Sequence, residues 1–195
     1  MTTGFATLTR QCWLFAIGSS FFAVATAPGF PLLAGAGTTN ALCFVGSWFF
    51  STAAYLQLVL ARRGLDWWSA ATQFAGTLLF NLSTGAAVWA HTIVGERRYV
   101  WAPDATGSMA FLVSGVLAVV AVGTWSPRSV DWRAAWINLA GCVAFGVSAL
   151  AAFVRKTGVT VDERLANFGT FVGALCFLAA ALMLRPRSDT ASTLR

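Results

Sequence analysis

The sequence contains few charged residues. Asp, Glu, Lys and Arg together make up 10% of its 195 residues, whereas they account for about 25% of soluble globular domains. Hydrophobic residues make up 57% of the chain, and the mean hydropathy is +0.70. This composition excludes an ordinary soluble domain, and it predicts that lipid is the solvent for most of the chain.

Residues that commonly catalyse reactions or bind metals are also scarce. The chain has one histidine and four cysteines, and no two cysteines form a C-x-x-C pair. No H-E-x-x-H, G-x-S-x-G, P-loop or zinc-binding spacing occurs. We therefore expect no catalytic residue, no metal and no cofactor, and we expect that the protein is not an enzyme. The cysteines, which we interpret as small apolar packing residues, are Cys12, Cys43, Cys142 and Cys176.

Acidic residues fall between the long apolar stretches or at their edges. Proton-coupled and ion-coupled transporters usually carry an ionisable group at membrane depth, and His91 is the one candidate of that kind here. This distribution favours a non-enzymatic role without ion coupling. The acidic residues are Asp66, Glu96, Asp104, Asp131, Asp162, Glu163 and Asp189.

The net charge of +6 does not indicate binding to nucleic acid, because no run of four or more basic residues occurs. Basic residues instead predict an orientation in the cell membrane. With both termini cytoplasmic, eight basic residues lie inside and five lie outside. The inside set is Arg10, Arg62, Arg63, Arg128, Arg133, Arg185, Arg187 and Arg195, and the outside set is Arg97, Arg98, Arg155, Lys156 and Arg164.

Six long apolar stretches are each able to form a helix across a hydrocarbon core of about 30 Å. Helices are expected because backbone amides in lipid must pair within their own segment. We predict an all-α, multi-pass bundle in which residues 1–195 form one membrane domain. The first stretch ends in "AVATA" at 23–27, so it also fits a cleaved signal peptide. It contains the same repeated motif as the other five stretches, and this favours a retained helix. The stretches are 11–27, 39–61, 69–94, 107–125, 133–154 and 164–184.

One motif, a glycine followed four residues later by a phenylalanine, occurs once in each stretch. It recurs every 28 to 34 residues, which is the length of one helix and one loop. Residues i and i+4 share a helix face, so we expect each ring to lie over the glycine of its own helix and to form a helix-packing surface. The pairs are Gly18 and Phe22, Gly46 and Phe50, Gly76 and Phe80, Gly107 and Phe111, Gly141 and Phe145, and Gly173 and Phe177.

The first and last pairs of stretches agree beyond this motif, which indicates a duplicated two-helix unit with one orientation. "FAIGSSFFAVATA" and "NALCFVGSWFF", with their partners "NLAGCVAFGVSALAAF" and "NFGTFVGALCF", resemble the bacterial, uncharacterised YrhK-like membrane domain. The resemblance implies hairpins at 10–61 and 133–184, and it implies no catalytic residue. The middle hairpin at 69–125 keeps only the glycine and the phenylalanine of the motif and departs from the family pattern. Cys142 stands where that pattern leads us to expect serine.

The third stretch carries a polar stripe at helical spacing. The stripe is interpreted either as the lining of a solute path or as side chains that hydrogen-bond neighbouring helices, and the second interpretation is favoured. His91 at its end is expected to be solvated at the membrane surface. The stripe residues are Gln73, Thr77, Asn81, Thr84 and His91.

Two classes of function follow. The first is a structural, accessory or partner-binding membrane protein, whose partners are the lipid bilayer and a second copy or another membrane protein. The second is a transporter or channel for a small neutral or amphiphilic solute. The polar tail at 185–195 is expected to lack a folded structure.

Overall fold

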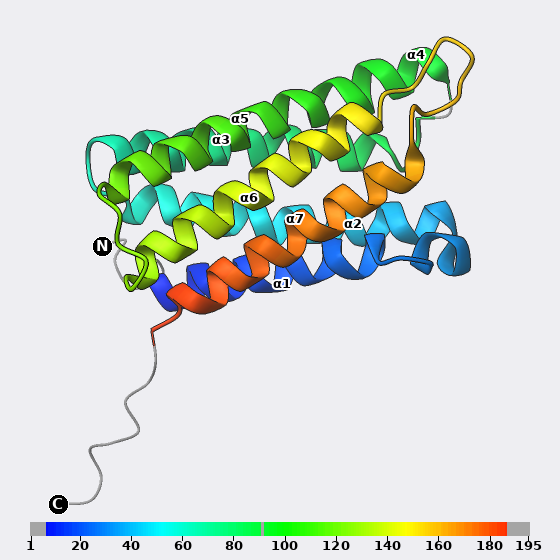
Figure 1. The fold of residues 1–195 in the computed structure, drawn as a ribbon. Coiled ribbons are helices and arrows are strands. Elements are labelled where there is room, and N and C mark those ends of the chain that lie inside the picture. Colours follow the sequence, from blue (N-terminus) through cyan, green and yellow to red (C-terminus); the bar gives the residue numbers. More distant parts are fainter. Residues whose placement is uncertain (1–6, 91, 187–195) are drawn as a thin grey trace, which may run out of the picture.

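A computed structural model describes residues 7–90 and 92–186, and within these ranges the chain is helical with no β-strand. Six long helices and two short helical segments follow one another along the chain (Figure 1). They are α1 (Leu8–Thr26), α2 (Phe30–Leu60), α3 (Leu65–Ala86), α4 (Ile93–Gly95), the π-helical turn η1 (Glu96–Trp101), α5 (Ala102–Val122), α6 (Val130–Ala151) and α7 (Glu163–Leu184).

Side-chain caps define where several of these helices begin. Oδ1 of Asp162 accepts a hydrogen bond of 2.9 Å from the backbone N–H of Leu165 at the start of α7. Ser129 caps α6 in the same way, and Thr7 caps α1. Each cap satisfies a backbone donor that the first turn of a helix leaves without a partner.

The six long helices form a closed ring. In space their order is α1, α2, α3, α5, α6 and α7, and α7 packs against α1 to complete the circle. Neighbouring helices are antiparallel, so α1 begins and α7 ends at the same end of the bundle (Figure 1). Packing is closest within three hairpins, which are α1 with α2, α3 with α5, and α6 with α7.

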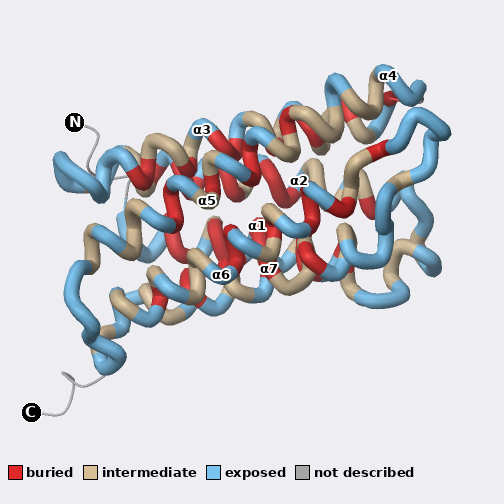
Figure 2. The backbone as a smooth tube through the Cα atoms, turned by 45° about the horizontal axis from the view of Figure 1, so that its top comes forward, coloured by how far each residue is buried: buried red, intermediate tan, exposed pale blue. Residues whose placement is uncertain are grey.

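Small residues, polar residues and a set of phenylalanine rings are buried inside this ring, while large apolar side chains also cover much of its outside. Burial follows the inward faces of the helices (Figure 2). Ser19, Ser47 and Thr77 are buried, whereas Trp48, Val143 and Leu150 are exposed. Soluble proteins rarely expose so many large apolar side chains, so this arrangement indicates a surface that faces lipid.

Within the described ranges, the helices and the absence of β-strands confirm the all-α fold, and four segments are long and apolar enough to cross a membrane, which indicates a membrane protein. The two remaining long helices, α1 and α3, are not among these four segments. The four segments are Phe30–Leu60, Ile93–Val122, Val130–Ala151 and Glu163–Leu184.

Three of the predicted boundaries were wrong. The stretch expected at 69–94 ends at Ala86, and Val94 belongs to the separate short helix α4. The stretch expected at 39–61 is preceded by a short helical segment that begins at Phe30, and the two join at a kink at Gly35, where the backbone is not helical and φ is +78°. The stretch expected at 107–125 begins at Ile93. The polar segment 96–101 forms the π-helical turn η1, which connects α4 to α5 without a break. Asp104, which we expected at the edge of a span, therefore lies well inside a continuous helix of 30 residues.

Candidate functional site

The motif glycines lie where the two helices of a hairpin cross. A Cβ atom built on Gly18 would lie 2.9 Å from the carbonyl oxygen of Gly46. The same approach occurs in the middle hairpin, where a Cβ atom on Gly107 would lie 3.0 Å from the carbonyl oxygen of Gly76. Gly141 and Gly173 face each other in the third hairpin. A missing side chain on each helix thus allows the two backbones to approach closely.

Each of these glycines is covered by a ring from the paired helix. A Cβ atom on Gly173 would lie 2.5 Å from Cδ2 of Phe145. The expectation that each ring covers the glycine of its own helix is therefore corrected, since the nearest ring comes from the facing helix. The contacts pair Gly18 with Phe50, Gly46 with Phe22, Gly76 with Phe111, Gly107 with Phe80, Gly141 with Phe177, and Gly173 with Phe145.

The same six phenylalanines meet on the axis of the ring, and we call them the aromatic core. Their side chains are at most 6% exposed. Phe145 and Phe177 stack with centroids 5.3 Å apart, and Phe80 and Phe111 stack at 4.9 Å. Phe145 also contacts three further core rings, which makes it the best connected of the six. The members of the aromatic core are Phe22, Phe50, Phe80, Phe111, Phe145 and Phe177.

A second set of packing residues was missed in the sequence analysis. The residue that directly follows each motif glycine is at most 2% exposed. All six are small or medium-sized, and four carry a hydroxyl group. Extending the glycine motif by one position would have identified these residues from the sequence. Cys142 is one of them. The set is Ser19, Ser47, Thr77, Ser108, Cys142 and Ala174.

The polar stripe of α3 does not form one continuous lining. Thr77 donates a hydrogen bond to its own helix, at the carbonyl oxygen of Phe74. Oδ1 of Asn81 accepts a hydrogen bond of 3.0 Å from Ser51 on α2, and Thr84 donates to Ser47 on α2 at 3.2 Å.

Of this stripe, Gln73 alone among the described members reaches a sizeable cavity. Position 91 lies outside the described residues, and α3 itself ends at Ala86.

A cavity of about 370 Å³ opens at the end of the ring where α1 begins and α7 ends, and we call it the end cavity. All six long helices contribute to its wall. Phe15, Phe50 and Phe177 line its inner part, and two of these rings belong to the aromatic core. Arg62 and Asp131 line it at the outer end of the helices. The end cavity is therefore a pocket whose inner side meets the aromatic core.

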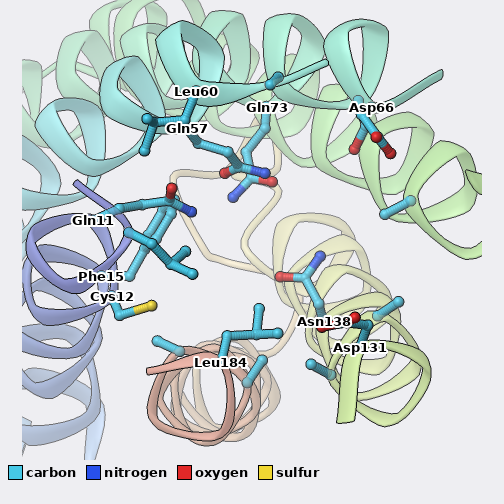
Figure 3. A pocket seen from close by; sticks show the side chains of 18 of the residues that line it. Gln11, Cys12, Phe15, Gln57, Leu60, Asp66, Gln73, Asp131, Asn138 and Leu184 are labelled. Carbon is cyan, nitrogen blue, oxygen red and sulfur yellow. The ribbon is translucent and has the colours of Figure 1, made fainter. Parts of the chain in front are cut away.

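Carboxamide groups from four helices point into this space. Figure 3 shows Gln11 from α1, Gln57 from α2, Gln73 from α3 and Asn138 from α6 around the cavity. Oε1 of Gln57 is buried and has no hydrogen-bond partner. A buried acceptor without a partner is uncommon, because leaving one unsatisfied costs ~1–3 kcal/mol.

Hydrogen bonds to α5 hold Gln73 in place. Oγ of Ser114 lies 3.2 Å from Oε1 of Gln73 and 2.8 Å from the carbonyl oxygen of Ser69. Ser69 in turn donates to the carbonyl oxygen of Ser114 at 2.9 Å. Ser114 has one hydroxyl hydrogen and its shorter contact is to Ser69, so Gln73 offers the cavity its NH₂ group and also acceptor capacity on its oxygen.

The end cavity offers hydrogen bonds, an apolar surface and the thiol of Cys12 (Figure 3). Among the described residues, no cluster of three or more His, Cys, Asp or Glu side chains is able to hold a metal ion. Gln11 and Gln57 belong to none of the motifs found in the sequence, Asn138 begins one of the YrhK-like phrases, and the three come together through the closure of the ring. Comparisons of the chain with protein-family models, curated proteins and solved structures give no match.

Proposed function

We propose that the chain is a six-span membrane protein with both termini in the cytoplasm. Supporting this, α1 and α3 stand in the same ring as the four strongly apolar segments. With 19 and 22 residues they reach about 30 Å at 1.5 Å per residue. Arg62, Arg63 and Arg128 lie in the turns at the end where α1 begins, which fits a cytoplasmic position for that end.

We further propose that its role is non-enzymatic, as a structural, accessory or partner-binding protein of the cell membrane. The observation that carries this proposal is the aromatic core, because six buried rings occupy the axis along which a channel would have to run. Packed interiors of this kind contain few voids larger than a water molecule. The expected partners are lipid and either a second copy or another membrane protein, and the YrhK-like character of the outer hairpins stays a prediction.

Solute flux into proteoliposomes tests this role. We expect liposomes that contain the wild-type protein to swell in xylitol or urea no faster than empty liposomes, because the aromatic core blocks the axis. Stopped-flow light scattering measures the swelling, and liposomes with a known glycerol channel serve as the positive control. Swelling at least tenfold faster than in empty liposomes would overturn the proposed structural, accessory or partner-binding role.

The end cavity favours a second candidate, a transporter for a small neutral or amphiphilic solute. In that case the aromatic core acts as a gate that opens during transport. Gln73 lines the cavity and Asn81 does not, so the two variants discriminate. Uptake that is lost in Gln73→Leu and retained in Asn81→Leu would support the second candidate.

A further inference from the structure

We propose that the end cavity binds one uncharged small molecule that carries a hydrogen-bond donor on an apolar body. This inference deepens the second candidate function, because it assigns a ligand class to the same cavity. It concerns binding, so it does not require that the ligand crosses the membrane.

The size of the end cavity suits a small organic ligand. Its volume of about 370 Å³ falls within the range of ~300–1,000 Å³ that is usual for ligand pockets. The inner part presents the rings of Phe15, Phe50 and Phe177, together with the methyl groups of Ala180 and Ala181. These side chains form an apolar surface against which a ring or a short alkyl chain packs.

The polar groups in the wall define the polar part of the ligand. Oε1 of Gln57 is an acceptor without a partner, so it requires a donor from whatever occupies the cavity. Gln11 and Asn138 bring further amide groups from other helices, and Asn138 meets a protein partner only through a weak contact of 3.8 Å from its Nδ2 to the sulfur of Cys142. An N–H or O–H group of the ligand placed beside Gln57 satisfies the buried oxygen.

Charge in the wall is confined to its outer part. The described ionised side chains in the wall, Arg62, Asp66 and Asp131, are all exposed at the ends of their helices. Deeper in, the polar groups are carboxamides and the hydroxyl group of Ser69. A charged group on the aromatic surface would lack an ionic partner there, and burial of an unpaired charge is costly. The wall therefore selects against organic ions.

Three probes of similar size and different charge test this inference. Benzamide is uncharged and carries N–H donors, whereas benzylammonium is a cation and benzoate is an anion. The full-length protein is placed in lipid nanodiscs, and binding of each probe is measured by equilibrium dialysis against empty nanodiscs. We expect benzamide to bind at least tenfold more tightly than either ion. Equal binding of the three probes, or no benzamide binding above the empty nanodiscs, would overturn the inference.

Matched variants locate the probe. Gln57→Leu removes the unpaired oxygen at similar size, and we expect it to weaken benzamide binding at least tenfold, because the donor of the probe then loses its acceptor. Thr52→Val changes an exposed residue on the same helix, and we expect it to leave binding unchanged. Unchanged affinity in a folded Gln57→Leu protein would overturn the inference.

A second variant covers the case in which Gln57→Leu does not fold. Ala181→Phe places a ring in the inner part of the cavity, and we expect it to abolish benzamide binding by occupying the space. Retained binding in this variant would also overturn the inference. Failure of the inference and failure of the proposed function are distinguishable, because the flux assay reports transport while these assays report occupancy of the cavity. Binding of benzamide without flux supports the inference and leaves the structural role standing.

Discussion

Replacement of Gly173 by valine is expected to destabilise the protein by ~3 kcal/mol or to prevent its folding. A Cβ atom at this position would lie 2.5 Å from the ring of Phe145 and 3.1 Å from the carbonyl oxygen of Gly141. The ring is buried in the aromatic core and the carbonyl belongs to the facing backbone, so neither is free to move away. Helices α6 and α7 would have to separate. Unfolding in detergent, followed by circular dichroism during titration with sodium dodecyl sulfate, measures the loss.

Gly37→Val is the matched control for this substitution. Gly37 lies in α2, and a Cβ atom there would meet nothing within 4 Å. We expect this variant to unfold within ~0.5 kcal/mol of the wild type. If Gly173→Val were as stable as Gly37→Val, the close crossing of α6 and α7 would not contribute to the fold.

Replacement of Phe145 by alanine is expected to cost ~3–5 kcal/mol, the range for removal of a buried aromatic side chain. Phe145 contacts Phe22, Phe80, Phe111 and Phe177, so its loss leaves a cavity between all three hairpins. In a membrane this loss is chiefly one of van der Waals contact, because helices in lipid have no hydrophobic drive to associate. The same detergent titration measures it.

The control for this second substitution is Phe168→Ala on α7. Phe168 is 53% exposed, and its replacement leaves the aromatic core intact. We expect a change below ~1 kcal/mol. A similar loss in both variants would mean that the bundle is stabilised by total apolar surface and not by packing at its axis.

The repeated motif predicted which residues meet inside the bundle but not which helix supplies each partner. Spacing by four residues places Gly18 and Phe22 on one face of α1, and that is a local property. The ring that covers Gly18 is Phe50, which comes from the facing helix through the crossing of α1 and α2. A period in the sequence carries no information on that crossing.

The predicted start of α2 was wrong because residues that are typical of turns lie within this helix. Pro31 lies in the first turn of α2, where a missing N–H group is tolerated. Gly35 then adopts a positive φ that other residues avoid, so the backbone kinks at this residue and the helix resumes after it. Read from the sequence alone, these residues are typical of a loop.

The end cavity could not be predicted, because its polar residues are scattered. Gln11, Gln57 and Asn138 lie on three helices and share no spacing with one another. Their approach depends on the contact between α7 and α1 that closes the ring. The polar stripe of α3 was recognised, yet Asn81 and Thr84 bond to α2, and one described member, Gln73, reaches the end cavity.

The most direct test of the six-span arrangement is the sidedness of four of the five connections between its long helices. Single cysteines are introduced at Gly29, Gly64, Gly123 and Gly158 in a protein whose four native cysteines are replaced, and each is labelled in intact cells with a membrane-impermeant maleimide. We predict labelling from outside at positions 29 and 158, and no labelling at 64 and 123 until the membrane is opened. Labelling of positions 29 and 64 from the same side would contradict the account, because α2 would then fail to cross the membrane between its two neighbours.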